Sequence, residues 1–184
     1  MTQSTFAISG LAARLFAILC LVLLAAPLQA DISRFVGKYS GSADVIAADG
    51  TPTPRDMSVE ISETGKGFQV SWTSVTHRVD GTSKEKTYSI NFVPSDRDGV
   101  FSAAMARNVF GHSVQMDPMK GEPYVWARII GDTLSVYSLY VDSVGGYEIQ
   151  QFNRTLAPGG LDLEFVSLRN GERQRSVSTF LKRH

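Results

Sequence analysis

Cysteine is almost absent from this sequence. The single cysteine, Cys20, lies in an apolar stretch near the N-terminus, so residues 31–184 contain none. That absence excludes disulfide bonds, cysteine–zinc sites and thiol chemistry from the rest of the chain. The stability of residues 31–184 must therefore come from packing alone.

Net charge and histidine are also scarce. The 18 basic and 18 acidic side chains cancel, and a chain without a strong positive field is not expected to bind nucleic acid. The three histidines, His77, His112 and His184, have no second metal ligand at helix or strand spacing. We therefore expect no metal and no other cofactor.

Recognisable catalytic motifs are lacking as well. Gly111-His112-Ser113 has part of the nucleophile-elbow pattern but lacks its closing glycine. Asp96 and Asp98 stand in a proline- and glycine-flanked segment and are better explained as turn residues. No glycine-rich loop precedes a helix in the way that phosphate-binding loops do. The sequence therefore indicates no catalytic residues, and an enzyme with dispersed catalytic groups is kept only as an alternative.

The first thirty residues differ from the rest. Arg14 is their only charge, and a nearly unbroken apolar run extends from Leu15 to Ala26. With the small residue Ala30 before Asp31, this pattern is typical of a cleaved secretory signal peptide. The run is shorter than the ~20 residues that a membrane-spanning helix needs, and an uncleaved anchor is the alternative. We expect residues 31–184 to be one periplasmic or secreted domain that does not span the membrane after signal cleavage.

Residues 31–184 carry the pattern of an antiparallel β-meander. Apolar and polar side chains alternate in several segments, for example over residues 68–73, and turn sequences such as Gly131-Asp132 and Asn170-Gly171 separate them. We count about ten such segments, spaced roughly eight to twelve residues apart. The sequence predicts an all-β fold, an antiparallel meander of about ten strands closed into a barrel, with a two-sheet β-sandwich as the alternative. Residues 100–116 fit either a strand or a helical turn.

One tripeptide and one arginine resemble a known family. A helical turn predicted at residues 31–36 precedes Gly37-Lys38-Tyr39, and Arg183 lies near the end of the last predicted strand. This arrangement resembles the calycin-like barrels, the lipocalins and fatty-acid-binding proteins, in which lipocalins usually carry tryptophan where this chain has Tyr39. The resemblance implies an internal cavity for a small, mostly apolar ligand.

The hairpin turns also predict which residues face one another. A two-residue Gly131-Asp132 loop pairs Trp126 with Tyr137 and Arg128 with Ser135. The corner at residues 158–160 pairs Phe152 with Phe165 and Arg154 with Leu163, and the Asn170-Gly171 turn pairs Phe165 with Ser176. If Asp142 pairs with Tyr147, one face of the sheet carries the predicted ligand-binding residues, which are Trp126, Arg128, Tyr137, Phe152, Arg154 and Phe165.

An aromatic row beside two arginines suits an amphiphilic anion, because the rings contact the apolar body and the guanidinium groups bind the acid. A slip of one residue at the Gly145-Gly146 corner would instead move Arg154 to the other face. The opposite face of the 124–141 hairpin is also apolar, so Trp126 and Tyr137 could lie at a dimer interface or under a lid. The apolar residues of that opposite face are Val125, Ala127, Ile129, Leu134 and Val136.

Three functions follow as hypotheses from different classes. The first is an exported, non-catalytic β-barrel that binds a small amphiphilic or apolar ligand. The second is an envelope structural or interaction protein that uses the apolar hairpin as an interface, with a homodimer as one such assembly, and the third is an enzyme with an unrecognised site. A transmembrane β-barrel is disfavoured because the predicted non-core face of the first strands carries charges such as Glu60, Lys66 and Lys84.

Overall fold

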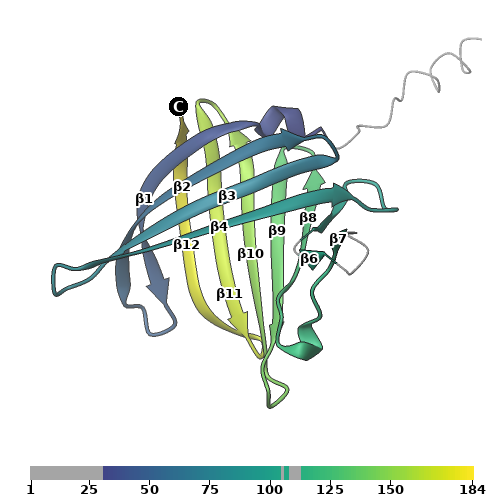
Figure 1. Cartoon of the computed structure of the whole chain (residues 1–184). Coiled ribbons are helices and arrows are strands. Elements are labelled where there is room, and N and C mark those ends of the chain that lie inside the picture. The colour runs from purple at the N-terminus through teal and green to yellow at the C-terminus, as the bar shows by residue number, and fades with distance from the viewer. Residues whose placement is uncertain (1–30, 105, 108–112) are drawn as a thin grey trace, which may run out of the picture.

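A computed structural model describes residues 31–104, 106–107 and 113–184. Ten of the strands in this part of the chain form one closed antiparallel barrel, and consecutive strands are neighbours almost throughout (Figure 1). The ten strands are β1 (Gly37–Ala47), β2 (Pro52–Thr64), β3 (Gly67–His77), β4 (Ser83–Pro94), β5 (Val100–Ala103), β8 (Tyr124–Ile130), β9 (Thr133–Val141), β10 (Tyr147–Ala157), β11 (Gly160–Arg169) and β12 (Glu172–Arg183). The predicted all-β meander is confirmed, and closure of the ladder decides for the barrel over the two-sheet sandwich.

Four short elements complete the described part. The 3₁₀ helix η1 (Ile32–Phe35) precedes the barrel, and Asp31 begins it by accepting a hydrogen bond from the Ser33 amide. Between β5 and β8 lie the two-residue strands β6 (Ala106–Arg107) and β7 (Ser113–Val114) and the 3₁₀ helix η2 (Pro118–Lys120). The ambiguous stretch, residues 100–116, therefore contains strand at 100–103, 106–107 and 113–114, whereas His112 lies outside the described residues.

The first and last strands close the barrel. β1 pairs antiparallel with β12, with Tyr39 opposite Arg183 and Ala47 opposite Arg175. Close approach of the two strands requires a glycine, because a Cβ atom on Gly41 would lie 2.5 Å from the carbonyl oxygen of Phe180. Each strand of the ladder thus has a neighbour on both sides over at least part of its length, and closure removes the edges that invite edge-to-edge association.

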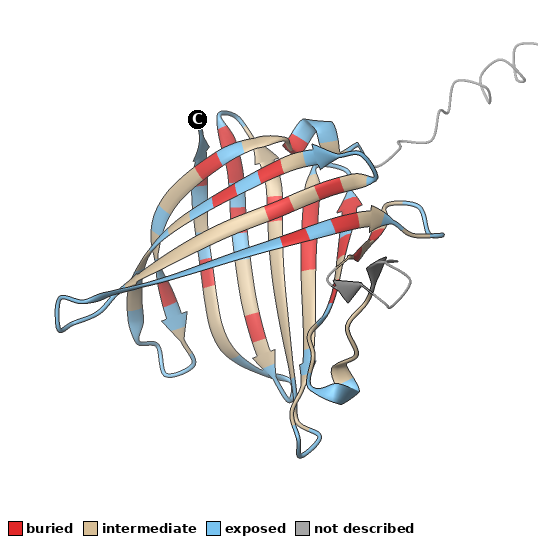
Figure 2. Cartoon of the chain, in the orientation of Figure 1, coloured by how far each residue is buried: buried red, intermediate tan, exposed pale blue. Residues whose placement is uncertain are grey.

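The interior is filled at the end of the barrel that η1 covers. Phe35 of η1 is fully buried, and Tyr39 donates a hydrogen bond of 2.8 Å to the Phe35 carbonyl oxygen. Phe68 stacks on Phe92 with 5.0 Å between ring centroids and meets Phe101 edge-on at 4.9 Å. On β2, β3 and β4 the buried positions lie toward this end, whereas the opposite ends of these strands are intermediate or exposed (Figure 2). We call the η1 side the closed end and the opposite side the loop end.

Two of the predicted hairpin registers are confirmed. Trp126 pairs with Tyr137 and Arg128 with Ser135 in the β8–β9 hairpin. Phe152 pairs with Phe165 and Arg154 with Leu163 in the β10–β11 hairpin. Both hairpins have short loops, in which the number of loop residues leaves little choice of register.

The register across the Gly145-Gly146 corner is one residue away from the prediction. Tyr147 pairs with Val141 rather than Asp142, so Arg154 lies opposite Leu134 and Phe152 opposite Val136. Asp142 is drawn out of the ladder because its carboxylate accepts hydrogen bonds from the Val144 and Gly146 amides. Such local capping by an aspartate competes with strand pairing, and here it lengthens the loop by one residue.

The last hairpin contains a β-bulge that the turn did not predict. Arg169 pairs with Glu172 as expected, but the register shifts between Ser167 and Leu168, and Phe165 pairs with Val177 rather than Ser176. The shift turns Val177 and Leu181 toward the interior, where they are 6% and 1% exposed. Without the bulge, Ser176 and Phe180 would occupy those inward positions, because side-chain direction alternates along a strand.

Candidate functional site: an interior cavity with buried arginine

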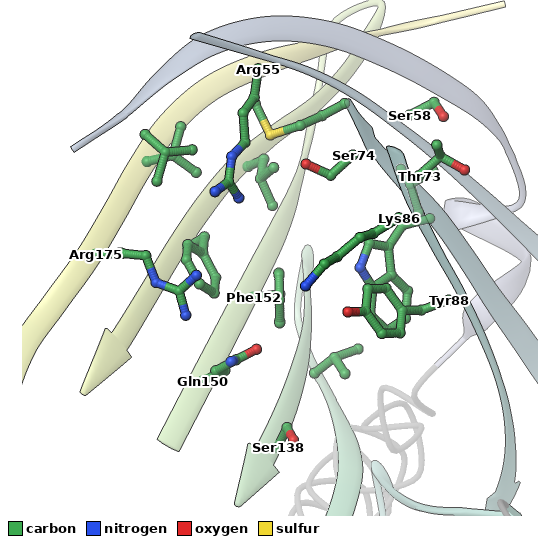
Figure 3. Close-up of a pocket in the computed structure, with 18 of the residues that line it drawn as sticks. Arg55, Ser58, Thr73, Ser74, Lys86, Tyr88, Ser138, Gln150, Phe152 and Arg175 are labelled. Atoms are coloured by element: carbon green, nitrogen blue, oxygen red, sulfur yellow. The ribbon is translucent and has the colours of Figure 1, made fainter. Parts of the chain in front are cut away.

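The loop-end half of the barrel is hollow. A cavity of about 630 Å³ lies between the inner faces of the strands, a size that suits a small organic ligand. Its side chains come from opposite walls, chiefly β2, β3 and β4 on one side and β9 to β12 on the other (Figure 3). The same inward alternation that fills the closed end with large apolar groups places arginine, lysine, serine and glutamine here.

Four aromatic rings form a connected row along the cavity. Tyr88 of β4 stacks on Trp72 of β3 with 5.3 Å between centroids, and Trp72 reaches across the barrel to Phe152 of β10 at 5.8 Å. Phe152 in turn contacts Phe165 of β11 at 4.6 Å. Trp72 and Phe152 also pack against the buried core. The row therefore joins the two walls between the packed closed end and the hollow loop end, and it offers flat apolar surface to a ligand.

Arg154 is buried in the cavity wall without a counter-charge. Its side chain is 3% exposed, and its strand neighbours Leu134 and Leu163 are apolar. Nε and Nη1 have no hydrogen-bond partner among the described residues, while the guanidinium carbon lies 5.5 Å from the centroid of the Phe152 ring. Burial lowers the pKa of Arg154 to about 10, so the group is still a cation at neutral pH.

A buried cation with free donors is unfavourable unless an anion binds to it. Leaving an ionised group in an apolar environment costs several kcal/mol, roughly, and the cost is recovered only by a hydrogen-bonded opposite charge. Guanidinium is suited to carboxylate, phosphate and sulfate, because its donors match two acceptor oxygens at once. Arg154 thus gives this wall of the cavity the chemistry needed to bind an anion.

Nearer the loop end, Glu148 is the centre of a separate polar network. One of its carboxylate oxygens accepts hydrogen bonds from Ser167 at 2.8 Å, from Gln150 at 2.8 Å and from Arg175 at 3.2 Å. Burial raises the pKa of Glu148, but these donors and the positive charge of Arg175 outweigh it, and the pKa is lowered overall. Glu148 is therefore ionised at neutral pH and is already engaged by its neighbours.

The six residues predicted to bind ligand are divided between the two faces of the barrel wall. Phe152, Arg154 and Phe165 line the cavity. Trp126, Arg128 and Tyr137 belong to the outward-facing positions of β8 and β9, because Val125, Ala127, Ile129, Leu134 and Val136 face the core and are at most 5% exposed. The one-residue difference at the β9–β10 corner separates the two groups, so the continuous row Trp126–Tyr137–Phe152–Phe165 does not form.

The outward group forms a small aromatic cluster of its own. Trp126 stacks on Tyr137 with 4.8 Å between centroids and 11° between ring planes. Tyr124, which is 38% exposed, lies 5.9 Å from Trp126. We call these three residues the outer aromatic cluster. The aliphatic face of the β8–β9 hairpin therefore lies in the core, and its aromatic face points outward.

Four of the cavity residues that the sequence did not assign to the site are Trp72, Tyr88, Arg55 and Arg175. Trp72 and Tyr88 share a face with Phe68 and Phe92 in the sequence alternation, so the same pattern that predicted the core could have placed them inside. Arg55 continues the inward series of Met57, Val59 and Ile61 on β2. The bulge in β12 hides the fourth residue, Arg175, because it reverses the direction of the side chains that follow it.

Another polar cluster lies at the loop end on the outer side of β1 to β4. Asp56 accepts hydrogen bonds from Ser42 at 2.6 Å and contacts His77 Nε2 at 2.7 Å, and His77 Nδ1 lies 3.1 Å from Ser83 Oγ. Hydrogen bonds from Ser42 and His77 lower the pKa of Asp56. His77 and Asp56 are about half exposed to solvent. We interpret this cluster as side-chain hydrogen bonding that stabilises the pairing of neighbouring strands.

Metal and membrane-helix features are absent from the described part of the chain. Residues 31–104, 106–107 and 113–184 contain no group of three or more histidine, cysteine or acidic side chains that could hold a metal ion. Within the same ranges, no helix is both long and apolar enough to cross a membrane.

Comparison of the sequence with models of known protein families and with curated proteins gives no match. The site is therefore interpreted from its own geometry and chemistry.

Proposed function

We propose that this protein is a non-catalytic binding protein that holds a small amphiphilic anion inside its barrel. The observation that carries the proposal is Arg154, a cavity-lining cation with 3% exposure and two donor atoms without partners among the described residues. The acid group of the ligand binds Arg154, and the apolar body lies along the row formed by Tyr88, Trp72, Phe152 and Phe165. A cavity of about 630 Å³ can accommodate such a molecule.

The contact between Tyr39 and Arg183 supports the calycin-like resemblance as part of the same proposal. The Arg183 guanidinium lies 5.8 Å from the centroid of the Tyr39 ring and donates a hydrogen bond to the Val36 carbonyl oxygen. Tyr39 and Arg183, the two residues on which the resemblance rests, thus contact each other at the closed end. We further propose that the protein is exported to the periplasm or the medium after its signal peptide is cleaved. The mass of the mature protein tests this export, because the mature chain should begin at Asp31.

The test measures binding of dodecanoate and of its uncharged analogue dodecanol to the protein after organic extraction, by displacement of a fluorescent probe. Arg154→Met keeps the length of the side chain and removes its charge. We expect this variant to bind dodecanoate about 10- to 100-fold more weakly, the loss of one charged hydrogen-bonded contact, and to bind dodecanol as the wild type does. Equal dodecanoate affinity in the two proteins would refute the proposal.

Native mass spectrometry of protein from its own host gives an independent test. A small adduct that organic extraction removes supports an internal ligand and supplies its mass. If the adduct is seen with the wild type but not with Arg154→Met, the ligand is an anion held by this guanidinium. An adduct retained unchanged by the variant contradicts an acid group at Arg154.

The outer aromatic cluster favours one alternative, a homodimer that functions through protein–protein contact. Tyr124, Trp126 and Tyr137 form a stacked surface on the outer wall, and aromatic side chains are enriched at such interfaces. Analytical ultracentrifugation should then show a concentration-dependent dimer that Trp126→Ser abolishes. A monomer at all concentrations would eliminate this alternative and leave the binding function unaffected.

A further inference from the structure

We propose that the ligand carries two acidic groups, one bound at Arg154 and the other at Arg55 and Arg175 nearer the loop end. This inference rests on the proposed function and specifies the chemical class of the ligand. It follows from two guanidinium groups, those of Arg154 and Arg55, that have unpartnered donors among the described residues and that lie at different levels of the same cavity.

Arg55 is the second cation whose donors are incompletely used. It lies on the inner face of β2, lines the cavity, and has a buried Nε atom with no hydrogen-bond partner among the described residues. Burial and the nearby positive charge of Arg175 both lower the pKa of Arg55. Two like charges held close together in a partly buried place repel each other, and an anion between them relieves the repulsion.

The groups around Arg55 converge on one space. In Figure 3, the Arg55 guanidinium from β2 and the Arg175 guanidinium from β12 turn toward the same part of the cavity, and the amine of Lys86 extends toward it from β4. Side chains of three separate strands thus present hydrogen-bond donors to a common volume. Charged donors that converge in this way are the arrangement by which proteins bind carboxylate and phosphate groups.

The balance of charge in the cavity favours more than one anion, although Arg78, Lys84 and Lys86 are exposed to solvent. Six basic side chains line it, whereas Glu148 is the one acidic side chain among the described lining residues; the six are Arg55, Arg78, Lys84, Lys86, Arg154 and Arg175. Glu148 already accepts hydrogen bonds from Ser167, Gln150 and Arg175. A single acid group at Arg154 would leave Arg55 without a counter-charge.

The two anion sites are separated along the barrel by apolar side chains. Arg55 is three residues from the start of β2, near the β1–β2 loop, whereas Arg154 is three residues from the end of β10, toward the closed end. Phe152, Phe165 and Val177 occupy neighbouring inward positions between these levels. A ligand that satisfies both sites therefore has acid groups at its two ends and an apolar body in the middle.

The experiment compares dodecanedioate with dodecanoate by isothermal titration calorimetry at low salt. The two probes have the same chain length and differ in the second carboxylate. The wild type should bind the diacid about 10- to 100-fold more tightly than the monoacid, the effect of an additional charge-assisted contact. Arg55→Gln should remove most of this preference and leave dodecanoate affinity within about 2-fold, whereas Arg55→Lys, which retains the charge, should restore part of it.

Two further variants separate the ways in which the proposals could fail. Arg128→Gln removes an outward-facing arginine from the same barrel and should change neither affinity. Arg154→Gln should weaken both probes. If Arg55→Gln weakens both probes equally, or if the wild type binds the two probes with equal affinity, the second site is refuted while the first stands. If the wild type binds neither probe, or if Arg154→Gln leaves dodecanoate affinity unchanged, the proposed function itself fails.

Discussion

The same strands build the closed end and the loop end of this barrel. The two ends differ in the kind of side chain that points inward. At the closed end the inward positions of β2, β3 and β4 are Val59, Ile61, Phe68, Val70 and Phe92, each at most 3% exposed. At the loop end the same strands point Arg55, Ser74, Thr76 and Lys86 inward. One half is a packed core that stabilises the fold, and the other is a cavity lined by polar and charged groups.

This difference assigns stability to the closed end and the proposed ligand binding to the loop end of a single sheet. A packed interior gains free energy from each apolar contact, whereas a hollow with isolated cations loses it. The aromatic row from Tyr88 to Phe165 lies between the two. Substitutions at the two ends should therefore change the free energy of unfolding by different amounts, and in one case with opposite sign.

The largest effect is expected from truncation at the closed end. Phe68→Ala removes a ring that contacts Phe92 and Phe101 at about 5 Å, and we expect it to lower the free energy of unfolding by about 3–5 kcal/mol. Phe152→Ala is the matched change beside the cavity and should cost only about 1–2 kcal/mol, because one side of this ring faces open space. Urea denaturation followed by circular dichroism measures both. Equal losses would mean that the loop end is packed as tightly as the closed end.

An effect of opposite sign is expected from the buried cation. Arg154→Met should raise the free energy of unfolding of the ligand-free protein by about 1–3 kcal/mol, because it removes an ionised group that has no partner among the described residues. Arg128→Met on the outer face should change stability by less than about 0.5 kcal/mol. Denaturation after organic extraction provides the measurement. A loss of stability in Arg154→Met would show that the guanidinium is satisfied within the folded chain.

The smallest effect is expected from the hydroxyl group of Tyr39. Tyr39→Phe removes the hydrogen bond to the Phe35 carbonyl oxygen and should cost about 1 kcal/mol at neutral pH. Burial raises the pKa of Tyr39, partly opposed by Arg183, so the folded chain keeps a proton that the unfolded chain releases above its pKa. The stabilisation from this group is therefore complete below about pH 10 and is lost as the pH rises through the folded-state pKa.

The pH dependence tests the Tyr39 assignment. The wild type should lose stability between neutral pH and alkaline pH more steeply than Tyr39→Phe, when thermal unfolding is followed at each pH. Identical slopes for the two proteins would mean that Tyr39 ionises as freely when folded as when unfolded, and that the closed end admits solvent.

The sequence predicted the class of fold and much of its local pairing, and it predicted the site only in part. Alternation along the strands and the short turns were sufficient for the β8–β9 and β10–β11 registers. Both registers that deviated depend on interactions outside the turn type: Asp142 caps its own loop, and β12 needs a bulge to bring Val177 and Leu181 inside. A register obtained by counting residues from the turn predicts neither the capped loop at Asp142 nor the bulge in β12.

The face of each hairpin was the decisive uncertainty for the site. The aliphatic face of residues 124–136 and the aromatic face were both plausible interiors, and the structure places the aliphatic one in the core. Trp126, Arg128 and Tyr137 therefore point outward. Arg154 and Phe152 point inward because the register at the β9–β10 corner differs by one residue from the predicted one. Arg154 is therefore in the cavity with a different set of neighbours, and its partnerless state is a property that only the three-dimensional arrangement reveals.

Pairing of β1 with β12 has a consequence for how the chain reaches its native state. These strands are the first and last of the barrel, so their contact closes a loop of nearly the whole domain, and the entropy of that closure must be overcome before the contact stabilises anything. All-β topologies with many such distant contacts fold in about milliseconds to seconds rather than microseconds. Until β12 docks, β1 and β11 are exposed edges, and the cavity has no wall between Arg55 and Arg154. The cavity is thus complete only once β12 has paired with both β1 and β11, and a chain shortened by its last strand would lose the cavity together with the barrel.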